Sequence, residues 1–271
     1  MRIGLTLPQF RATADDALAA AVAAEGAGID GVFVFDHQWP IGQPDRPAIP
    51  SQVLLGALAV ETARVALGPL VARVSLYPNA VLTHALVTAA RMSGPRFIAG
   101  LGTGDSLNRA ENEAYGVPFL PVAERLADLE DCCRRLASEH VPTWAGGLSP
   151  MVRRVAAELA SGWNGWALST ADWALAAADV RTFAADAGRA GEVECTWGGQ
   201  VLVARTDDAV EAKRQRLGDR RGLVSGTVGD LSEHLRRLAG DGCAFAVCAP
   251  LDVGDDPDVP AMVADAAARA A

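Results

Sequence analysis

Short apolar segments alternate along the chain with longer stretches rich in Ala and Leu. The short segments are apolar on both faces, as expected of β-strands buried in a parallel sheet. They predict strands at 2–8, 31–37, 65–73, 96–103, 142–147, 162–169, 196–204 and 243–251. The stretches between them repeat apolar residues at helical spacing. They predict helices at 14–27, 51–63, 79–93, 122–138, 149–161, 171–188, 208–217, 229–239 and 258–270.

The repeated order of a strand and then a helix predicts an α/β fold in which helices cover a parallel sheet. Eight such units favour a closed (β/α)8 TIM barrel, and an open doubly wound sheet is the alternative. No change of composition and no flexible linker divides residues 1–271, so we expect a single barrel domain. Barrels of this kind place their chemistry on the loops after the carboxyl ends of the strands.

Charge and cysteine content narrow the classes of partner. The chain has 33 acidic and 24 basic residues, a net charge of −9, and no run of Lys or Arg that would suit a phosphate backbone. We therefore expect no nucleic acid partner. The five cysteines form no C-x-x-C or Cys/His cluster, so neither a disulfide framework nor a metal site is predicted. Without a signal-peptide pattern or an apolar stretch of about 20 residues, we expect a cytoplasmic protein with no membrane partner.

One strand end carries a titratable pair. The segment "DGVFVFDHQWP" (30–40) leaves an apolar run at Asp36 and His37, and Trp39 follows. An imidazole titrates near neutral pH and a neighbouring carboxylate tunes it, so the pair can donate and accept protons. The simpler alternative is that both residues are solvated polar groups that end a strand.

Two other strand ends are rich in glycine. "GLGTGDSLN" (100–108) lets the backbone approach a ligand closely and can form an anion-binding concavity, or it is simply a strand-to-helix turn. "WAGGLSP" (144–150) places Ser149 as a helix N-cap and Pro150 in the first turn, and a helix start next to glycines can bind phosphate. Five tryptophans are expected to pack in the core, with the wall of a site as the alternative: 144, 163, 166, 173 and 197.

An ordered set of segments resembles a known family. These segments are "IGLTLPQF", "AEGAGIDGVFVFDH", "TARVALGPLVARVSLYPNAVLTHALVTAARMSGPRFIAGLGTGD", "ENEAYGVPF", "ERLADLEDCCRRL", "PTWAGGLSPMVRRVAAELASGWN" and "GTVGDLSEHLRRLAGDG". Together they resemble the luciferase-like monooxygenase superfamily, and most of all its branch that depends on coenzyme F420, a 5-deazaflavin. The resemblance implies a (β/α)8 barrel that binds a deazaflavin or a flavin at its carboxyl face, usually as a homodimer.

The resemblance also implies roles for individual residues. Asp36 would lie beside the cofactor ring, and His37 would take a substrate proton; we also expect Trp39 near the ring. Leu70 and Val71 would share a cis peptide bond behind the ring. Further cofactor contacts are implied for the loop residues Thr103, Gly104 and Asn108 and for the phosphate-binding amides of Gly146 and Gly147. Asp105 stands where sugar-phosphate dehydrogenases have a glutamate proton donor, and its side chain is one methylene shorter.

One departure from the family pattern separates the candidate cofactors. Leu76-Tyr77-Pro78 replaces an Arg-His-Pro that many flavin-binding relatives carry after the third strand. This departure and the "GTGD" loop favour F420 over FMN. We therefore expect an oxidoreductase that transfers a hydride between F420 and a small organic substrate. The alternatives are an FMN-dependent luciferase-like monooxygenase and a non-catalytic flavin-binding barrel.

Overall fold

The structure is a computed structural model that describes residues 1–220 and 222–271. Its strands are β1 (Arg2–Thr6), β2 (Gly31–Val34), β3 (Ala66–Pro69), β4 (Ala72–Arg73), β5 (Ala99–Gly102), β6 (Thr143–Gly146), β7 (Gly162–Trp166), β8 (Glu194–Ala204), β9 (Val224–Thr227) and β10 (Phe245–Pro250). Its α-helices are α1 (Asp15–Gly26), α2 (Ser51–Glu61), α3 (Asn79–Ser93), α4 (Arg109–Ala114), α5 (Val122–Ser138), α6 (Pro150–Leu159), α7 (Thr170–Asp186), α8 (Asp207–Leu217), α9 (Val228–Gly240) and α10 (Val259–Ala270). Short 3₁₀ turns, η1 and η2, cover Gly94–Arg96 and Ser106–Asn108.

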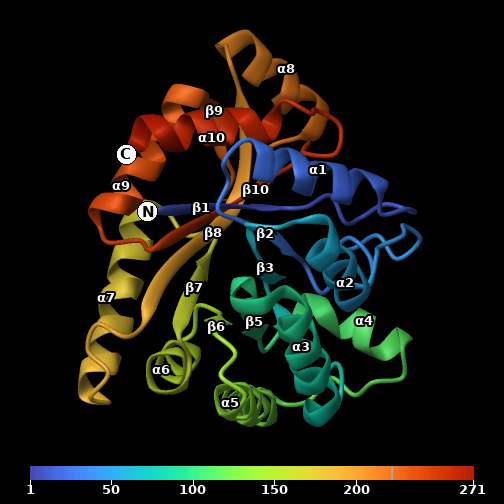
Figure 1. Ribbon diagram of the computed structural model, residues 1–271, viewed down its shortest axis with the longest axis vertical. Coiled ribbons are helices and arrows are strands. Elements are labelled where there is room, and N and C mark those ends of the chain that lie inside the picture. The colour runs from blue at the N-terminus through green and yellow to red at the C-terminus, as the bar shows by residue number, and fades with distance from the viewer. Residues whose placement is uncertain (221) are drawn as a thin grey trace.

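The strands form one parallel sheet that curls into a nearly closed barrel. Their order is β3-β2-β1-β10-β8-β7-β6-β5-β4, and β9 pairs with the far end of β8. Figure 1 shows the strands gathered in the centre with the helices around them. The expected (β/α)8 barrel is therefore confirmed, and the open doubly wound alternative is wrong.

The seam of the barrel lies at the third predicted strand, which is split into β3 and β4. β4 pairs with β5 over only two residue pairs, and β3 reaches the segment before β5 through a single bridge between Leu67 and Phe97. Glycine makes this close approach possible, because a Cβ atom at Gly68 would overlap the carbonyl oxygen of Ile98. The two ends of the sheet thus meet backbone to backbone.

Aromatic rings fill the inside of the barrel. The ring of Phe33 stacks on Trp144 at a centroid distance of 5.5 Å, and Phe245 meets both rings edge-on. Gly31 has no side chain where these rings pack, and a Cβ atom there would lie 2.9 Å from Phe245. The barrel interior below the carboxyl ends is therefore a packed core rather than a channel.

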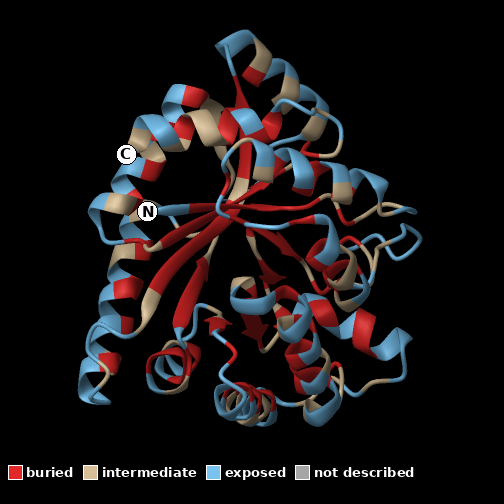
Figure 2. Ribbon diagram, viewed as in Figure 1, coloured by how far each residue is buried: buried red, intermediate tan, exposed pale blue. Residues whose placement is uncertain are grey.

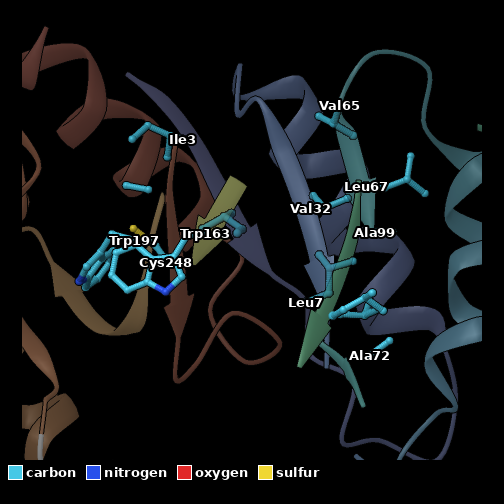
Figure 3. Close-up of a cluster of buried hydrophobic side chains, with 14 of the residues drawn as sticks. Ile3, Leu7, Val32, Val65, Leu67, Ala72, Ala99, Trp163, Trp197 and Cys248 are labelled. Atoms are coloured by element: carbon cyan, nitrogen blue, oxygen red, sulfur yellow. The ribbon is translucent and has the colours of Figure 1, made fainter. Parts of the chain in front are cut away.

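A second, larger apolar layer lies between the strands and the surrounding helices. Figure 2 shows the strands almost wholly buried, while the helices expose their outer faces. Figure 3 shows part of this layer, in which Val32 and Leu67 lie on one side and Trp163 and Trp197 on the other. Of the five tryptophans expected in the core, four are buried, and Trp166 is only partly buried. No helix among the described residues is long and apolar enough to cross a membrane.

Most predicted elements are present, and two observed elements were not predicted. All eight predicted strand segments contain a strand, and the nine predicted helices are observed as α1 to α3 and α5 to α10. The helix α4 and the strand β9 were missed. Both are short, and neither has an apolar repeat long enough to identify it.

Candidate active site

A cavity of about 930 Å³ opens at the carboxyl ends of the strands. This volume lies within the range of ligand pockets, about 300–1,000 Å³. Asp36, Gly104 and Gly146, which come from three different strand ends, all line it. The three strand ends predicted from the sequence to carry site residues therefore border one cavity.

Asp36 is buried at the end of β2 and is held by two donors. Its carboxylate accepts hydrogen bonds from Ser51 Oγ at 2.8 Å and from the Arg73 backbone N–H at 3.0 Å. Arg73 Nε also donates to the Asp36 carbonyl oxygen at 3.0 Å. Burial raises the pKa of the Asp36 carboxyl above its usual value, and the two hydrogen bonds and the Arg73 charge offset only part of this effect. Asp36 thus joins the start of α2 to β4 underneath the cavity.

His37 lies in the cavity wall and is anchored by a residue far along the chain. Its Nδ1 atom is 2.9 Å from Glu111 Oε1, and Glu111 Oε2 pairs with Arg73 at 2.5 Å. The side chains of Glu111 and Arg73 are only 2% and 5% exposed. A carboxylate paired with arginine accepts hydrogen bonds and does not donate them, so Nδ1 carries the proton whenever the imidazole is neutral. Nε2 is then the ring nitrogen that can accept a proton from a ligand in the cavity.

The third strand presents Leu70 and Val71 to the cavity between β3 and β4. The peptide bond between them is cis, as the family resemblance implied. Val71 lies over the ends of β5 and β6, where Gly102 and Gly146 have no side chains. A Cβ atom at Gly146 would lie 2.7 Å from Val71 Cγ1. These glycines therefore make room for Val71, which itself forms the surface that a ligand would meet.

The loop after β5 is fixed from both sides. Asp105 caps the 3₁₀ turn by accepting a hydrogen bond from Leu107 N at 2.8 Å, and Asn108 Oδ1 accepts from Asp105 N at 2.9 Å. From α5, the Arg125 guanidinium donates to the carbonyl oxygens of Thr103 and Gly104 at 2.6 and 2.7 Å. Asp105 is exposed at the cavity wall, so its carboxylate can reach solvent and ligand as well as its cap.

In the loop after β6, the backbone N–H and C=O of Gly147 form hydrogen bonds to other residues of the barrel. Gly147 N donates a long hydrogen bond of 3.3 Å to the Asn164 carbonyl, and the Gly147 carbonyl accepts from Trp163 Nε1 at 2.8 Å. Ser149 caps α6 by accepting from Val152 N, as its position predicted. Gly146, Gly147 and Ser149 all line the cavity, beside the amino end of this helix.

The sequence model of the family described as luciferase-like monooxygenase matches residues 1–141 and 129–241. The chain belongs to the luciferase-like monooxygenase family. The family assignment agrees with the parallel barrel and with the position of the cavity at its carboxyl face.

Curated relatives match part of the chain. An F420-dependent glucose-6-phosphate dehydrogenase of Kineococcus radiotolerans is 38% identical over 130 residues, covering 46% of this chain and 38% of that protein. The protein of the same name from Nakamurella multipartita is 29% identical over 169 residues, covering 52% of this chain and 49% of that protein. The match therefore spans less than half the length of each of these relatives.

Solved structures match the whole fold at low sequence identity. An F420-dependent secondary alcohol dehydrogenase in complex with an F420-acetone adduct has a TM-score of 0.85 at 16% identity, covering 100% of this chain and 99% of that chain. A coenzyme F420-dependent tetrahydromethanopterin reductase from Methanopyrus kandleri has a TM-score of 0.77 at 17% identity, covering 97% of both chains. At these identities the likeness shows the fold alone.

The structure brings most of the predicted site residues together, and their roles stay predictions. The residues that line the cavity are Asp36, His37, Leu70, Val71, Thr103, Gly104, Asp105, Asn108, Gly146 and Gly147. Trp39 is not among the residues that line the cavity. Its ring stacks on the ring of Tyr115 at a centroid distance of 6.1 Å. Sequence reasoning missed Glu111, Arg73 and Ser51, which hold His37 and Asp36 in place.

Proposed function

We propose that this protein is an oxidoreductase that transfers a hydride between coenzyme F420 and a small organic substrate. The observation that carries the proposal is the position of His37 in the cavity wall, with Nδ1 fixed by Glu111 and Nε2 left for a ligand. The names of the curated relatives support F420 as the cofactor. When bound, a deazaflavin supplies a carbon centre that accepts or donates hydride.

The cavity suits a flat cofactor on the side formed by β3 to β6. Leu70 and Val71 offer an apolar surface there, and the loops at Gly104 and Gly147 bring backbone close to it. We infer that Val71 supports the ring and that the amino end of α6 near Ser149 holds the phosphate. Asp36 would hold the start of α2 and β4 in place beneath the ring. His37 would move the substrate proton at Nε2, and Asp105 is a second acid within the same wall.

A cofactor titration followed by kinetics tests this function. We expect sub-micromolar binding of F420 and much weaker binding of FMN, measured by fluorescence on the purified protein. Tight binding of FMN and oxygen-dependent turnover would instead support the monooxygenase alternative, and binding of neither cofactor would contradict both enzymes. His37→Ala should lower turnover about 10²- to 10⁴-fold while changing F420 affinity little, because a positioned base contributes that much to rate.

We also propose that the protein forms a homodimer through the outer faces of α2 and α3, which pack side by side. Val53 and Val60 on α2 are 69% and 77% exposed, and Val81 and Met92 on the neighbouring α3 are also exposed. α2 has no charged side chain before Glu61, so the face offers little to water and suits a second copy of itself.

Analytical ultracentrifugation of the wild type and of Val60→Glu tests the dimer. We expect the wild type to sediment as a dimer and Val60→Glu as a folded monomer. Leu175→Glu is the control, because Leu175 is also exposed but lies on α7, which packs against α6 and α9. We further propose that the protein works in the cytoplasm, since all five cysteines are free and buried, as suits a reducing compartment.

A further inference from the structure

An aromatic wall stands next to the imidazole of His37. We use this name for Phe10, Phe35 and Trp166, which line the cavity on the side of β1, β2 and β7. The rings of Phe10 and Phe35 stack at a centroid distance of 6.1 Å and an interplanar angle of 6°. The ring of Trp166 meets that of Phe35 edge-on at a centroid distance of 5.7 Å. The His37 ring centroid is 6.4 Å from both phenylalanine rings. The nitrogen available for proton transfer thus lies beside a continuous apolar surface.

The middle of the aromatic wall is rigidly held. Gln9 is buried, and its Nε2 atom donates to the carbonyl oxygens of Phe35 and Ile49 at 2.7 and 2.8 Å. The Phe35 backbone N–H donates to Gln9 Oε1 at 2.7 Å. One side chain therefore fixes both backbone groups of Phe35. A surface fixed in this way binds a ligand without first losing its own conformational freedom.

The inner part of the cavity presents few free positive charges. Arg11 is paired with Asp16 at 3.1 Å and with Asp255 at 2.7 Å. Arg73 is paired with Glu111. The other two arginines that line the cavity, Arg46 and Arg220, are exposed, and Arg46 donates to Gln43 Oε1 at 3.0 Å and to the Phe10 carbonyl oxygen at 3.5 Å. A phosphate group bound at Arg11 or Arg73 would therefore have to displace an existing carboxylate partner, which disfavours a sugar phosphate at these two positions.

We propose that the substrate is an uncharged aryl ketone or the corresponding secondary alcohol, with its aromatic ring packed on Phe10 and Phe35. This inference rests on the proposed function. In the oxidation direction, the C–H bond breaks and its hydride passes to oxidised F420, while the O–H proton passes to His37 Nε2 and the C–O bond becomes C=O. In reduction, hydride from reduced F420 forms the C–H bond and the proton returns from His37 to oxygen.

Two measurements test the substrate class. The first compares kcat/KM for acetophenone, acetone and a sugar phosphate in assays coupled to F420. We expect acetophenone to exceed acetone about 10- to 100-fold, because its ring buries apolar surface and gains aromatic contacts. The second follows binding of the same compounds to the protein without cofactor, by ligand-observed NMR. Here only acetophenone should show a signal that depends on the aromatic wall.

A pair of variants ties the result to the wall. Phe10→Leu should lower the acetophenone-to-acetone ratio about three- to tenfold and weaken the NMR signal, since the stacked ring is lost. Phe183→Leu is the control, because Phe183 lies on α7 outside the barrel, where Arg154 covers its ring. F420-coupled turnover in which acetone or the sugar phosphate equals acetophenone would overturn the substrate class and leave the proposed function standing. Acetophenone binding that depends on Phe10, without any F420 turnover, would support the aryl site and contradict the cofactor.

Discussion

Glu111 gives the sharpest test of how the site is built, because it holds His37 and Arg73 at once. Removing one partner of a buried ion pair costs about 3–5 kcal/mol. In Glu111→Gln the remaining amide oxygen can still accept a hydrogen bond from a charged group, a contribution of about 1.5–3 kcal/mol. We therefore expect the free energy of unfolding to fall by about 2 kcal/mol. The melting temperature should fall by roughly 4–8 °C.

The same helix supplies a matched control. Glu113 also lies on α4 and pairs with Arg109 at 3.8 Å, but its side chain is 62% exposed. Glu113→Gln should therefore change stability by only a few tenths of a kcal/mol. Urea unfolding followed by tryptophan fluorescence measures both variants, and F420-coupled turnover should fall about tenfold only in Glu111→Gln, as His37 loses its anchor. Equal stability and equal turnover of the two variants would refute the anchoring role of Glu111.

Three further predictions concern stability away from this ion pair. Burial lowers the pKa of His234 to about 4, so the unfolded state binds the proton at a higher pH than the folded state does. The free energy of unfolding of the wild type should therefore fall by on the order of 3 kcal/mol between about pH 6.5 and pH 4. His234→Gln should remove this loss. Lys213→Met should cost about 3–5 kcal/mol, because it leaves the fully buried Asp252 without the ammonium group 2.7 Å away. Gly146→Ala should cost about 1–3 kcal/mol and weaken F420 binding, because the added methyl group displaces Val71.

Each of these predictions has a matched control and a contrary outcome. His84→Gln alters an exposed histidine and should keep the wild-type pH dependence; the account of His234 fails if both histidine variants behave alike. Lys213→Arg keeps a cation beside Asp252 and should retain most of the stability, so an equal loss in Lys213→Met and Lys213→Arg would contradict the ion-pair argument. Gly240→Ala adds a methyl group where no atom lies within 4 Å, and a loss matching that of Gly146→Ala would refute the crowding.

The strands and long helices were predictable because each has a clear apolar pattern of its own. β9 has the sequence VSGT and α4 has RAENEA, and neither pattern separates them from a loop. β9 forms because the long β8 continues beyond β7 and offers a free edge at Val201–Ala204. That edge exists only in the folded barrel, so the four residues of β9 do not predict a strand on their own.

The site residues were predictable where they follow a strand directly, as Asp36, His37 and the glycines do. Glu111 was missed because its partner His37 is 74 positions away and only the barrel brings them together. Trp39 shows a related limit, since a sequence does not reveal which way a loop turns after a strand. In the structure this loop turns toward Tyr115, and the Trp39 ring stacks there. For Asp105, the pattern D-S-L-N could have indicated the observed capping role.

The seam between β3 and β5 has a consequence for motion. Backbone pairing is sparse there, with two residue pairs at β4 and one bridge at Leu67, whereas β8 is paired along both edges. Regions with few backbone hydrogen bonds open locally at a lower free energy than the whole protein unfolds. Amide hydrogens of Ala72 and Val74 should therefore exchange with solvent sooner than those in the middle of β8. The surface proposed to support a cofactor ring is thus built on the part of the barrel that fluctuates most easily, so a bound ring would slow that exchange.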